Sequence, residues 1–524
     1  MNPQKIEDSK VNYTGFTQWD ALGGSEKDLD KKHTYIHKPS ELSGGNVYIN
    51  AKENVSIVAS KVNALNDTSI KAAGDLILAG VLNKITEYHD KKTGGAFNII
   101  TDSSNKENSN ERFVDTEIIS GGSVALDSNN VFIDGALVNT GGALGVDAKG
   151  NFVVTAARQQ QQSDEENSRL SWEWFANKQK DKQFRAGFEI KHVNNKEKNS
   201  KTKSHFATLT ANKININADK DIRFYGTAIK TNQGDLALSA KEGVQFLAAI
   251  DYHLTDKERT IYSGGAHYDG GIDMFGSGVE GKYSYYEHHK MTNTSIASKT
   301  DINGNMLITA GEDITHQGAQ HQVNGEYHES AKNIYHMASN DKTISNSTEK
   351  EIKSGLGFNI NYSKYTRQIE KIIKDPANVL HHLGGTGSIK GISDPNAGVD
   401  IYASGGKTTK SGLSSLASVT EIAAADITLL ARENIIDDGT QYHAKGLNKE
   451  GGLFSLDAGH HFSHAAINSS QSEVDGEKGE GAIRVSTMTG KDIKVVLSGA
   501  AETSKKIMLV ACCYPHLLRR VVIF

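Results

Sequence analysis

Cysteine and proline are both scarce in this chain of 524 residues, which contains two cysteines and five prolines. The cysteines, Cys512 and Cys513, are adjacent and lie close to the end of the sequence. This excludes a disulfide framework and a cysteine-based zinc site. The fold must therefore gain its stability from hydrogen-bonded strands and from their stacking.

The sequence also lacks long apolar runs and a strong net charge. It has no run of about 18 apolar residues, which excludes a transmembrane helix. Residues 1–16, MNPQKIEDSKVNYTGF, contain no apolar segment of the signal-peptide type, so at face value we expect a cytosolic protein. If the chain is an internal piece of a larger protein, the missing signal carries no information. A net charge of −5 provides no basic field, so we expect no nucleic-acid partner.

Glycine is abundant, with 51 residues, while the hydrophobic fraction is a modest 37%. Asn, Ser, Thr and Lys make up most of the remainder. This mixture is too apolar and too periodic for a disordered chain, yet it is too poor in aliphatic residues for one large globular core. It favours many short strands joined by polar turns.

One pattern recurs along the chain. Residues 44–59, GGNVYINAKENVSIVA, contain two alternating runs separated by three polar residues, and each run ends in a small residue. Alternation of this kind is typical of strands that bury one face. Similar copies lie at 120–136, 211–228, 303–319 and 424–440. A second, related unit follows each copy at a spacing of about 20 residues, which is in the range of solenoid repeats.

A unit of about 20 residues with two or three short strands is typical of one coil of a parallel β-helix. We therefore predict an all-β fold, a right-handed parallel β-helix of about ten coils in five pairs. Successive coils would stack at about 4.8 Å, so each inward residue would contact its equivalent in the next coil. An antiparallel meander also explains the alternation, but it explains neither the constant spacing nor the small residues at matched positions.

The inward-facing residues of the coils are the predicted core. They alternate with polar residues in each copy, and a small residue is expected where the chain turns sharply. Two inward positions hold polar residues instead, His316 and Asp437, which we interpret as marks of a locally widened or distorted coil, with a functional site as the alternative. The predicted core comprises Val47, Ile49, Ala51, Val55, Ile57, Ala59, Val124, Leu126, Ile214, Ile216, Ala218, Ile222, Phe224, Met306, Ile308, Ala310, Ile314, Ile427, Leu429, Ala431 and Ile435.

Variable segments separate the coil pairs. They begin polar and then show glycine-rich turns and alternating strands, so we interpret them as β-hairpin excursions that leave and re-enter the helix at one corner. Within one of them, residues 366–383 have the apolar spacing of a short amphipathic helix. The predicted organisation is a lead-in or partial excursion at 1–43, coil pairs near 44–80, 120–157, 211–250, 303–338 and 424–466, excursions at 81–119, 158–210, 251–302 and 339–423, a last excursion or coil at 467–504, and an atypical tail at 505–524.

Motifs that would carry chemistry are sparse. The sequence contains no phosphate-binding glycine loop, nucleophile elbow, HExxH motif or GGxGxD calcium repeat. Neighbouring histidines on a strand point to opposite faces, and no further ligand accompanies the histidine pairs at a metal-site spacing, so we expect solvated histidines and no metal or cofactor. These pairs are His288 with His289, His381 with His382, and His460 with His461.

Acidic pairs recur at the corners or strand ends, where turn chemistry explains them. The alternative is a β-helical carbohydrate-active enzyme, either a polysaccharide lyase or a glycosidase, in which such acids are catalytic. Aromatic residues gather in two excursions, and we expect them to fasten hairpins to each other or to the rod, with a sugar- or partner-binding surface as the alternative. The acids are Asp219, Asp221, Glu312, Asp313, Asp437 and Asp438, and the aromatic residues are Trp172, Trp174, Phe175, Tyr283, Tyr285 and Tyr286.

The paired coils, their GGxVxLxAxxxVxIxGA-like pattern and the excursions between them resemble the haemagglutinin repeats of filamentous haemagglutinin-like exoproteins. The alternation of two coils with one excursion is most similar to a repeat region of contact-dependent inhibition proteins and related adhesins. The resemblance extends over residues 44–466. Alternating, glycine-rich excursion strands such as LGFNINY at 356–362 are compatible with membrane association, and hairpins packed on a rod require the same pattern.

This resemblance implies a non-enzymatic, monomeric rod segment of a secreted or surface-bound exoprotein of a Gram-negative bacterium. Its implied partners are an outer-membrane two-partner secretion transporter and the surface or outer membrane of a neighbouring cell. Its implied roles are adhesion or contact-dependent toxin delivery. Residues 505–524, KKIMLVACCYPHLLRRVVIF, differ abruptly in composition from the repeats, and we expect a frameshifted or fused end. We therefore expect a fragment of a larger exoprotein.

Overall fold

The computed structural model describes residues 4–14, 25–95, 100–178, 184–271, 274–361, 396–447, 451–488 and 492–513. These residues are all-β and include no helix. Accordingly, the described ranges hold no helix with the length and apolarity needed to cross a bilayer. The predicted helix at 366–383 lies outside them.

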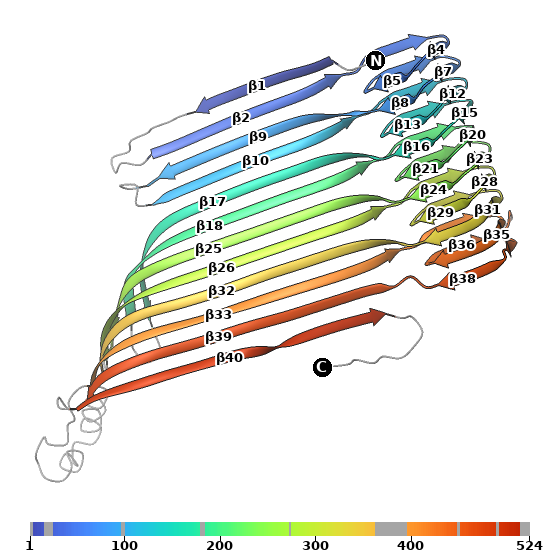
Figure 1. The fold of residues 1–524 in the computed structure, drawn as a ribbon. Coiled ribbons are helices and arrows are strands. Elements are labelled where there is room, and N and C mark those ends of the chain that lie inside the picture. The colour runs from blue at the N-terminus through green and yellow to red at the C-terminus, as the bar shows by residue number, and fades with distance from the viewer. Residues whose placement is uncertain are drawn as a thin grey trace, which may run out of the picture.

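The chain winds into a rod of stacked coils, each with three short strands (Figure 1). The first strands form a 10-stranded parallel sheet, and the second and third strands form two further parallel ladders. In two coils, one continuous strand takes the place of both the second and the third strand. These strands are β31 (Tyr327–Met337) and β35 (Ile427–Asp438). The first strands are β3 (Glu41–Gly44), β6 (Lys61–Ala64), β11 (Glu117–Ser120), β14 (Leu137–Thr140), β19 (Thr208–Ala211), β22 (Ala228–Thr231), β27 (Lys299–Ile302), β30 (Gln320–Val323), β34 (Thr420–Ala424) and β36 (Thr440–Ala444).

The second strand of a coil is five or six residues long in most coils, and the third is four or five. The second strands are β4 (Val47–Ala51), β7 (Thr68–Ala72), β12 (Val124–Ser128), β15 (Ala143–Ala148), β20 (Lys213–Ala218), β23 (Leu236–Ala240), β28 (Met306–Ala310) and β37 (Phe454–Asp457). The third strands are β5 (Val55–Val58), β8 (Leu76–Ala79), β13 (Val131–Asp134), β16 (Phe152–Thr155), β21 (Ile222–Tyr225), β24 (Val244–Leu247), β29 (Asp313–Gln317) and β38 (His460–His464).

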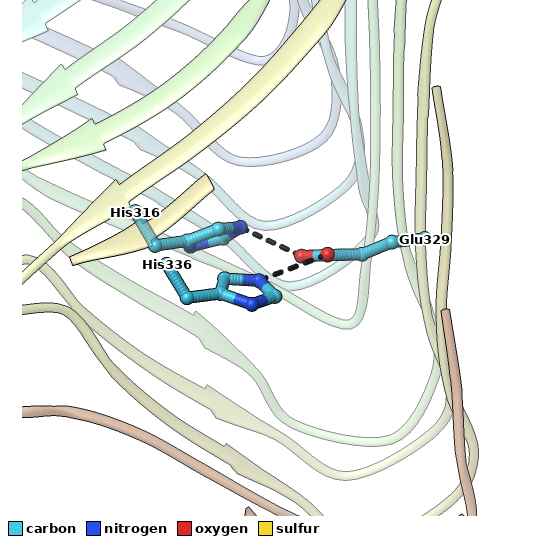
Figure 2. A group of neighbouring side chains, drawn as sticks. All are labelled: His316, Glu329 and His336. Carbon is cyan, nitrogen blue, oxygen red and sulfur yellow. Dashed lines mark hydrogen bonds and ion pairs between the residues drawn. The ribbon is translucent and has the colours of Figure 1, made fainter. Parts of the chain in front are cut away.

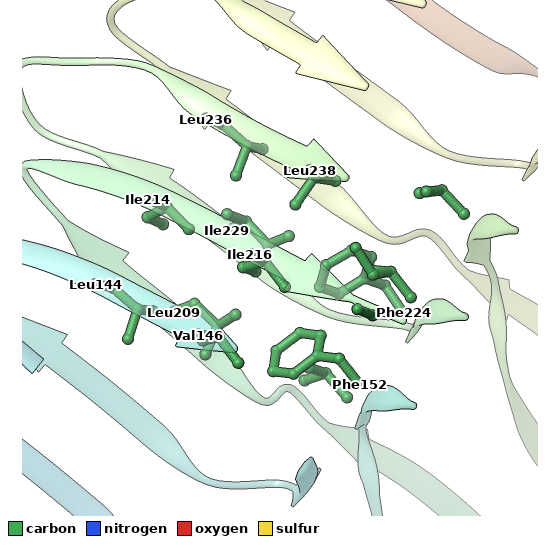
Figure 3. Close-up of a cluster of buried hydrophobic side chains, with 14 of the residues drawn as sticks. Leu144, Val146, Phe152, Leu209, Ile214, Ile216, Phe224, Ile229, Leu236 and Leu238 are labelled. Carbon is green, nitrogen blue, oxygen red and sulfur yellow. The ribbon is translucent and has the colours of Figure 1, made fainter. Parts of the chain in front are cut away.

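Parallel pairing in register places each inward residue on its counterpart in the next coil. Ile216 pairs with Leu238, which pairs with Ile308. On the third strands the rings of Phe224 and Phe246 stack with centroids 4.7 Å apart. The ring of Phe152, from the preceding coil, contacts Phe224 edge-on (Figure 3). The predicted parallel β-helix with paired coils and hairpin excursions is therefore confirmed, and the antiparallel meander is wrong for the rod.

The predicted core residues all lie inside this rod. All are buried except Ile49 and Ala51, which are half-buried and pack against the core. Both belong to the first coil, in which β4 pairs only with β7, so the coil is covered on one side. Their partial exposure follows from that position at the end of the stack.

The excursions join into one antiparallel sheet of 12 strands beside the rod, instead of projecting as separate hairpins (Figure 1). A hairpin occupies two strand spacings, about 9.6 Å, and a coil pair advances by the same two spacings. Consecutive hairpins therefore meet edge to edge and pair. The strands are β1 (Gln4–Thr14), β2 (Ser25–Lys38), β9 (Val81–Gly94), β10 (Thr101–Val114), β17 (Ala157–Lys178), β18 (Phe184–His205), β25 (Ala249–Gly270), β26 (Met274–Ile296), β32 (Ser339–Asn361), β33 (Asn396–Ser418), β39 (Asn468–Met488) and β40 (Asp492–Cys513).

The structure shows which strands the predicted terminal segments and excursions contain. Residues 1–43 contain the hairpin of β1 and β2, and the described residues between 468 and 504 belong to β39 and β40. In the tail expected at 505–524, residues through Cys513 continue β40, and the remainder lie outside the described residues. The last residues of the four segments that the sequence assigned to excursions belong instead to first strands of the coils. These strands are β11, β19, β27 and β34. Each has only four or five residues, too few to distinguish a coil strand from a hairpin strand by alternation.

In each of the five coil pairs, a residue with a left-handed backbone conformation follows the third strand of the first coil. Gly135, Gly226, Gly318 and Gly439 have φ angles of 58°, 56°, 60° and 71°, and Ala59 holds the position in the first pair with φ 41°. A Cβ atom on Gly226 would lie 2.6 Å from the Cβ atom of Ala249, where β25 begins. The corner therefore needs glycine both for its backbone conformation and because an excursion strand starts directly against it.

We expect Gly226→Ala to lower the free energy of unfolding by more than about 1 kcal/mol, because it combines left-handed strain with a steric clash. Urea unfolding followed by circular dichroism measures the change. The matched control is Gly145→Ala on β15, where an added Cβ atom meets nothing within 4 Å. That control should stay within about 0.5 kcal/mol of the original chain. Equal effects of the two substitutions would contradict this account of the corner.

Candidate functional site

An exposed row of apolar residues crosses the excursion sheet far from the rod. Its members face each other in the antiparallel ladders, so they project from the same face of the sheet. Trp174 is 70% exposed, Val279 53% and Leu356 48%, so nothing in the described chain covers them. The row runs through Trp174, Phe188, Ala266, Val279, Leu356 and Ile401.

Neighbouring rows on the same face are also rich in apolar residues, and together with the first row we call them the apolar band. Aromatic rings contact each other across the strands, with centroids 5.7 Å apart for Trp174 and Phe188 and 5.0 Å apart for Tyr262 and Tyr283. The additional exposed members of the apolar band are Trp172, Phe184, Ile190, Tyr262, Tyr268, Phe275, Ile352, Phe358 and Val399.

The opposite face of the same strands is polar and more sheltered. There Arg185 Nε donates to Asp269 Oδ1 over 2.7 Å, and Tyr402 donates its hydroxyl proton to Glu280 Oε2 over 3.0 Å. The Asp269 carboxylate raises the pKa of Arg185 by hydrogen bonding. The sheet thus has its apolar side chains on the more exposed face, the reverse of the usual arrangement in an isolated sheet that faces water.

The apolar band has a defined extent along the strands. Between the rows of Leu170 and Lys178, β17 advances by about 27 Å at the usual rise of a strand. Toward the rod the same face becomes charged, where Glu166, Lys196 and Glu258 lie in one row. An exposed apolar surface that ends at a charged border is typical of an interaction site.

Two groups of excursion aromatics were expected to fasten hairpins together. Trp172, Trp174, Tyr283 and Tyr285 lie on the face of the apolar band. Phe175 and Tyr286 are an odd number of residues away from them on the same strands, so they lie on the other face. Their rings do contact neighbouring strands, but Trp172 and Trp174 remain exposed. Fastening therefore accounts for only part of these side chains.

A second candidate site lies inside the rod. His316 on β29 and His336 on β31 are paired in register, one coil apart, and both point inward (Figure 2). Glu329, on the opposite wall of the same coil as His336, reaches across the interior to both rings. Its Oε1 lies 2.6 Å from Nε2 of His316, and its Oε2 lies 3.0 Å from Nε2 of His336. All three side chains have 0% exposure.

Further polar contacts extend this buried cluster in both directions. Nδ1 of His316 lies 2.8 Å from Nε2 of His321, whose Nδ1 lies 3.0 Å from the Thr300 hydroxyl. Nδ1 of His336 lies 3.0 Å from Oδ1 of Asp437. The cluster comprises Thr300, His316, His321, Tyr327, Glu329, His336, Asp437, Tyr442 and His461.

Burial and charge act in opposite directions on this cluster. Burial alone lowers the pKa of His336, but the Glu329 and Asp437 carboxylates outweigh it and raise that pKa to about 9. Burial alone raises the pKa of Glu329, but the two histidines hold it well below its usual value. Burial lowers the pKa of His316. Two carboxylates therefore remain charged inside an otherwise apolar rod.

The sequence pointed to only part of this cluster. The ladders pass through His316 and Asp437 without a register shift, and the one shift in this part of the rod lies between Ala331 and Asn333. The expected distortion at the two polar positions is therefore wrong, because other polar groups in the core partner them. Glu329 and His336 were missed, although both occupy inward positions of the alternating run at 325–338, where polar residues are a detectable signal.

The remaining candidate residues lie on the surface. His288 and His289 extend from β26, and His289 contacts Asp256. His460 is exposed, whereas His461 joins the cluster through Asp437 at 2.9 Å. His381 and His382 lie outside the described residues. The corner acids pair with surface neighbours, as in Asp219 with Lys241, Asp221 with Arg223, Glu312 with Lys332 and Asp313 with Asn333, while Asp438 is exposed.

The fold and its surfaces define a class of protein: a solenoid of paired coils that carries an amphipathic sheet of hairpins. The sequence profile of the hemagglutinin repeat family matches residues 20–96, 97–241, 192–320 and 279–371, more than half of the chain, so the chain belongs to this family. The resemblance that the repeats indicated is confirmed.

Two curated relatives extend the similarity over nearly the whole chain, and both are named hemolysin. One, from Serratia marcescens, is 34% identical over 96% of this chain. The other, from Proteus mirabilis, is 29% identical over 97%. The aligned region is 31% and 33% of these relatives, so the chain spans about a third of their length. No solved structure matches the chain.

We expect Glu329→Gln to lower the free energy of unfolding by about 3–5 kcal/mol, because the change leaves buried histidines without their charged partner. Urea unfolding monitored by fluorescence and circular dichroism measures the loss. The matched control is Glu312→Gln, whose carboxylate contacts Lys332 at the surface and is 59% exposed. This control should change stability by less than about 1 kcal/mol. Comparable losses in the two variants would contradict a central role for the buried carboxylate.

Proposed function

We propose that the chain is a non-enzymatic rod segment of a secreted exoprotein that engages the membrane of a neighbouring cell. The engagement serves adhesion or the delivery of a toxic activity. The observation that carries this proposal is the apolar band, which exposes tryptophan, phenylalanine and branched aliphatic side chains on one face of a long sheet. Burying such side chains is favourable by roughly 25 cal/mol per Å².

A lipid surface fits the apolar band better than a folded protein partner does. The band is about 27 Å long by the rise of its strands, similar to the hydrocarbon thickness of about 30 Å in a bilayer. Tyrosine and tryptophan, which prefer the boundary between hydrocarbon and water, are prominent within it. Charged residues appear where the sheet returns toward the rod. Lipid would therefore meet apolar atoms along the band and charge at its border.

The relatives support this assignment. Both curated relatives carry the name hemolysin, which describes proteins that damage red-cell membranes. From the hemagglutinin repeats and this similarity we infer a two-partner secretion route, with export through an outer-membrane transporter to the cell surface, for the exoprotein to which this segment corresponds.

In this proposal the rod has a structural role and not a catalytic one: it holds the excursion strands in position. Four of the corner acids, candidates for the carbohydrate-active alternative, pair with a basic or amide neighbour at the surface, while Asp437 belongs to the buried cluster and Asp438 is exposed. Stacked coils hold the excursion strands at a constant spacing, which keeps the apolar band continuous. The rod thus acts as the support of a binding surface.

The test is binding of the purified chain to phospholipid vesicles, measured by flotation and by the fluorescence of Trp172 and Trp174 in a Trp19→Phe background. We expect the chain to float with vesicles and its emission to shift to the blue. Ala266→Asp places a charge in the apolar band between Phe188 and Val279, and it should weaken vesicle binding at least about tenfold, because charge is costly in hydrocarbon.

The matched control is Ser263→Asp, three residues away on β25 but on the polar face, where Lys191 and Lys282 are its cross-strand neighbours. It introduces the same charge and should leave vesicle binding unchanged. A chain that neither floats nor changes its tryptophan emission would overturn the proposal. Equal losses in the two variants would show that the apolar band is not the binding face.

A further inference from the structure

The buried cluster inside the rod does not contribute to the apolar band, and it has the composition of a metal site. Two imidazole nitrogens and one carboxylate converge, and these ligand atoms all lie within 4.8 Å of one another. The residues come from two coils, because His316 and His336 are register partners and Glu329 faces them from the opposite wall. Stacking of the coils therefore assembles the group, and neither coil could form it alone.

One ring nitrogen in the group contacts its carboxylate partner without a well-aligned hydrogen bond. Nε2 of His316 lies 2.6 Å from Glu329 Oε1, so the two atoms form a close ion-pair contact, but the geometry is not that of a hydrogen bond. Buried ring nitrogens usually have a well-aligned partner. A cation bound between these two atoms would supply one to both.

The other ring nitrogens are supported as metal-binding histidines usually are. Nδ1 of His336 faces the Asp437 carboxylate at 3.0 Å, and Nδ1 of His316 faces Nε2 of His321 at 2.8 Å. Contacts of this kind fix the ring orientation and leave Nε2 for the metal. The Tyr327 hydroxyl contacts the Glu329 carboxylate and orients it in the same way.

Charge balance is compatible with a divalent ion. The cluster contains two buried carboxylates, Glu329 and Asp437, which require compensation and which hold a proton on His336 in the metal-free chain. One divalent cation with neutral imidazoles would balance both carboxylates and take the place of that proton. We propose that His316, Glu329 and His336 bind a divalent transition-metal ion, zinc being the best match to two imidazoles and one carboxylate, and that this ion fastens adjacent coils of the rod.

The experiment uses the chain unfolded, stripped of metal with a chelator, and refolded with zinc chloride, with cobalt chloride or with chelator alone. Mass spectrometry of the metal content should find one zinc ion per chain, and the cobalt form should absorb visible light as four-coordinate cobalt does. His316→Gln and His336→Gln should each reduce bound metal at least about tenfold. Asp437→Asn, which removes only a supporting contact, should weaken affinity by about 10- to 100-fold.

The control is His89→Gln, since His89 forms an exposed group with Asp28 and Asp30 that could also attract a cation. It should leave the bound zinc unchanged. A chain with native circular dichroism that binds neither zinc nor cobalt would overturn the site and leave a network of ion pairs. Should the histidine variants fail to fold, the original chain decides: it should unfold at higher urea with zinc than with chelator, and equal midpoints would overturn the proposal.

Discussion

In-register stacking of parallel coils is the interaction on which the rest of this structure depends. Each inward side chain contacts its counterpart one coil away, as in the stacked rings of Phe224 and Phe246. A single coil has too little apolar surface to bury by itself, so the coils are stable only as a stack. The same stacking sets the spacing at which the chain leaves and re-enters the rod.

The excursion sheet follows from that spacing. Every second coil releases a hairpin, and the width of a hairpin equals the advance of two coils, so separate insertions become neighbours in one 12-stranded sheet. Apolar residues that are far apart in the sequence, such as Trp174 and Leu356, then fall on one face of one surface. The rod does not touch this surface, but it determines its continuity.

Stacking also explains how a polar cluster is tolerated in an apolar core. A lone histidine or carboxylate in the interior would be strongly destabilising, but the coil period places His316 over His336 and within reach of Glu329. The contacts continue through Asp437 to His461, which is 39% exposed. The cluster therefore connects four consecutive coils through polar contacts, where the rest of the rod relies on apolar packing.

Much of the fold could be predicted from the sequence, because alternation and repeat spacing are local properties. The run at 44–59 and its relatives specified the strands, the inward residues and the small corner residues, and Gly226 lies at one such corner. The candidate sites were less accessible. Polar residues at 316 and 437 were visible as exceptions, but the partners that explain them depend on which coils are adjacent and on how the walls of one coil face each other.

The sequence by itself determined the repeat, the β-helix and the membership of the chain in its family, because these depend on side-chain periodicity and on short motifs. Only the tertiary structure decided that the hairpins share one sheet, which of its faces is apolar, and that two histidines and a glutamate meet inside the rod. The physical reason is that strand pairing between excursions and contacts across the coil interior join residues that no local pattern relates. Their positions follow only after the coils have stacked.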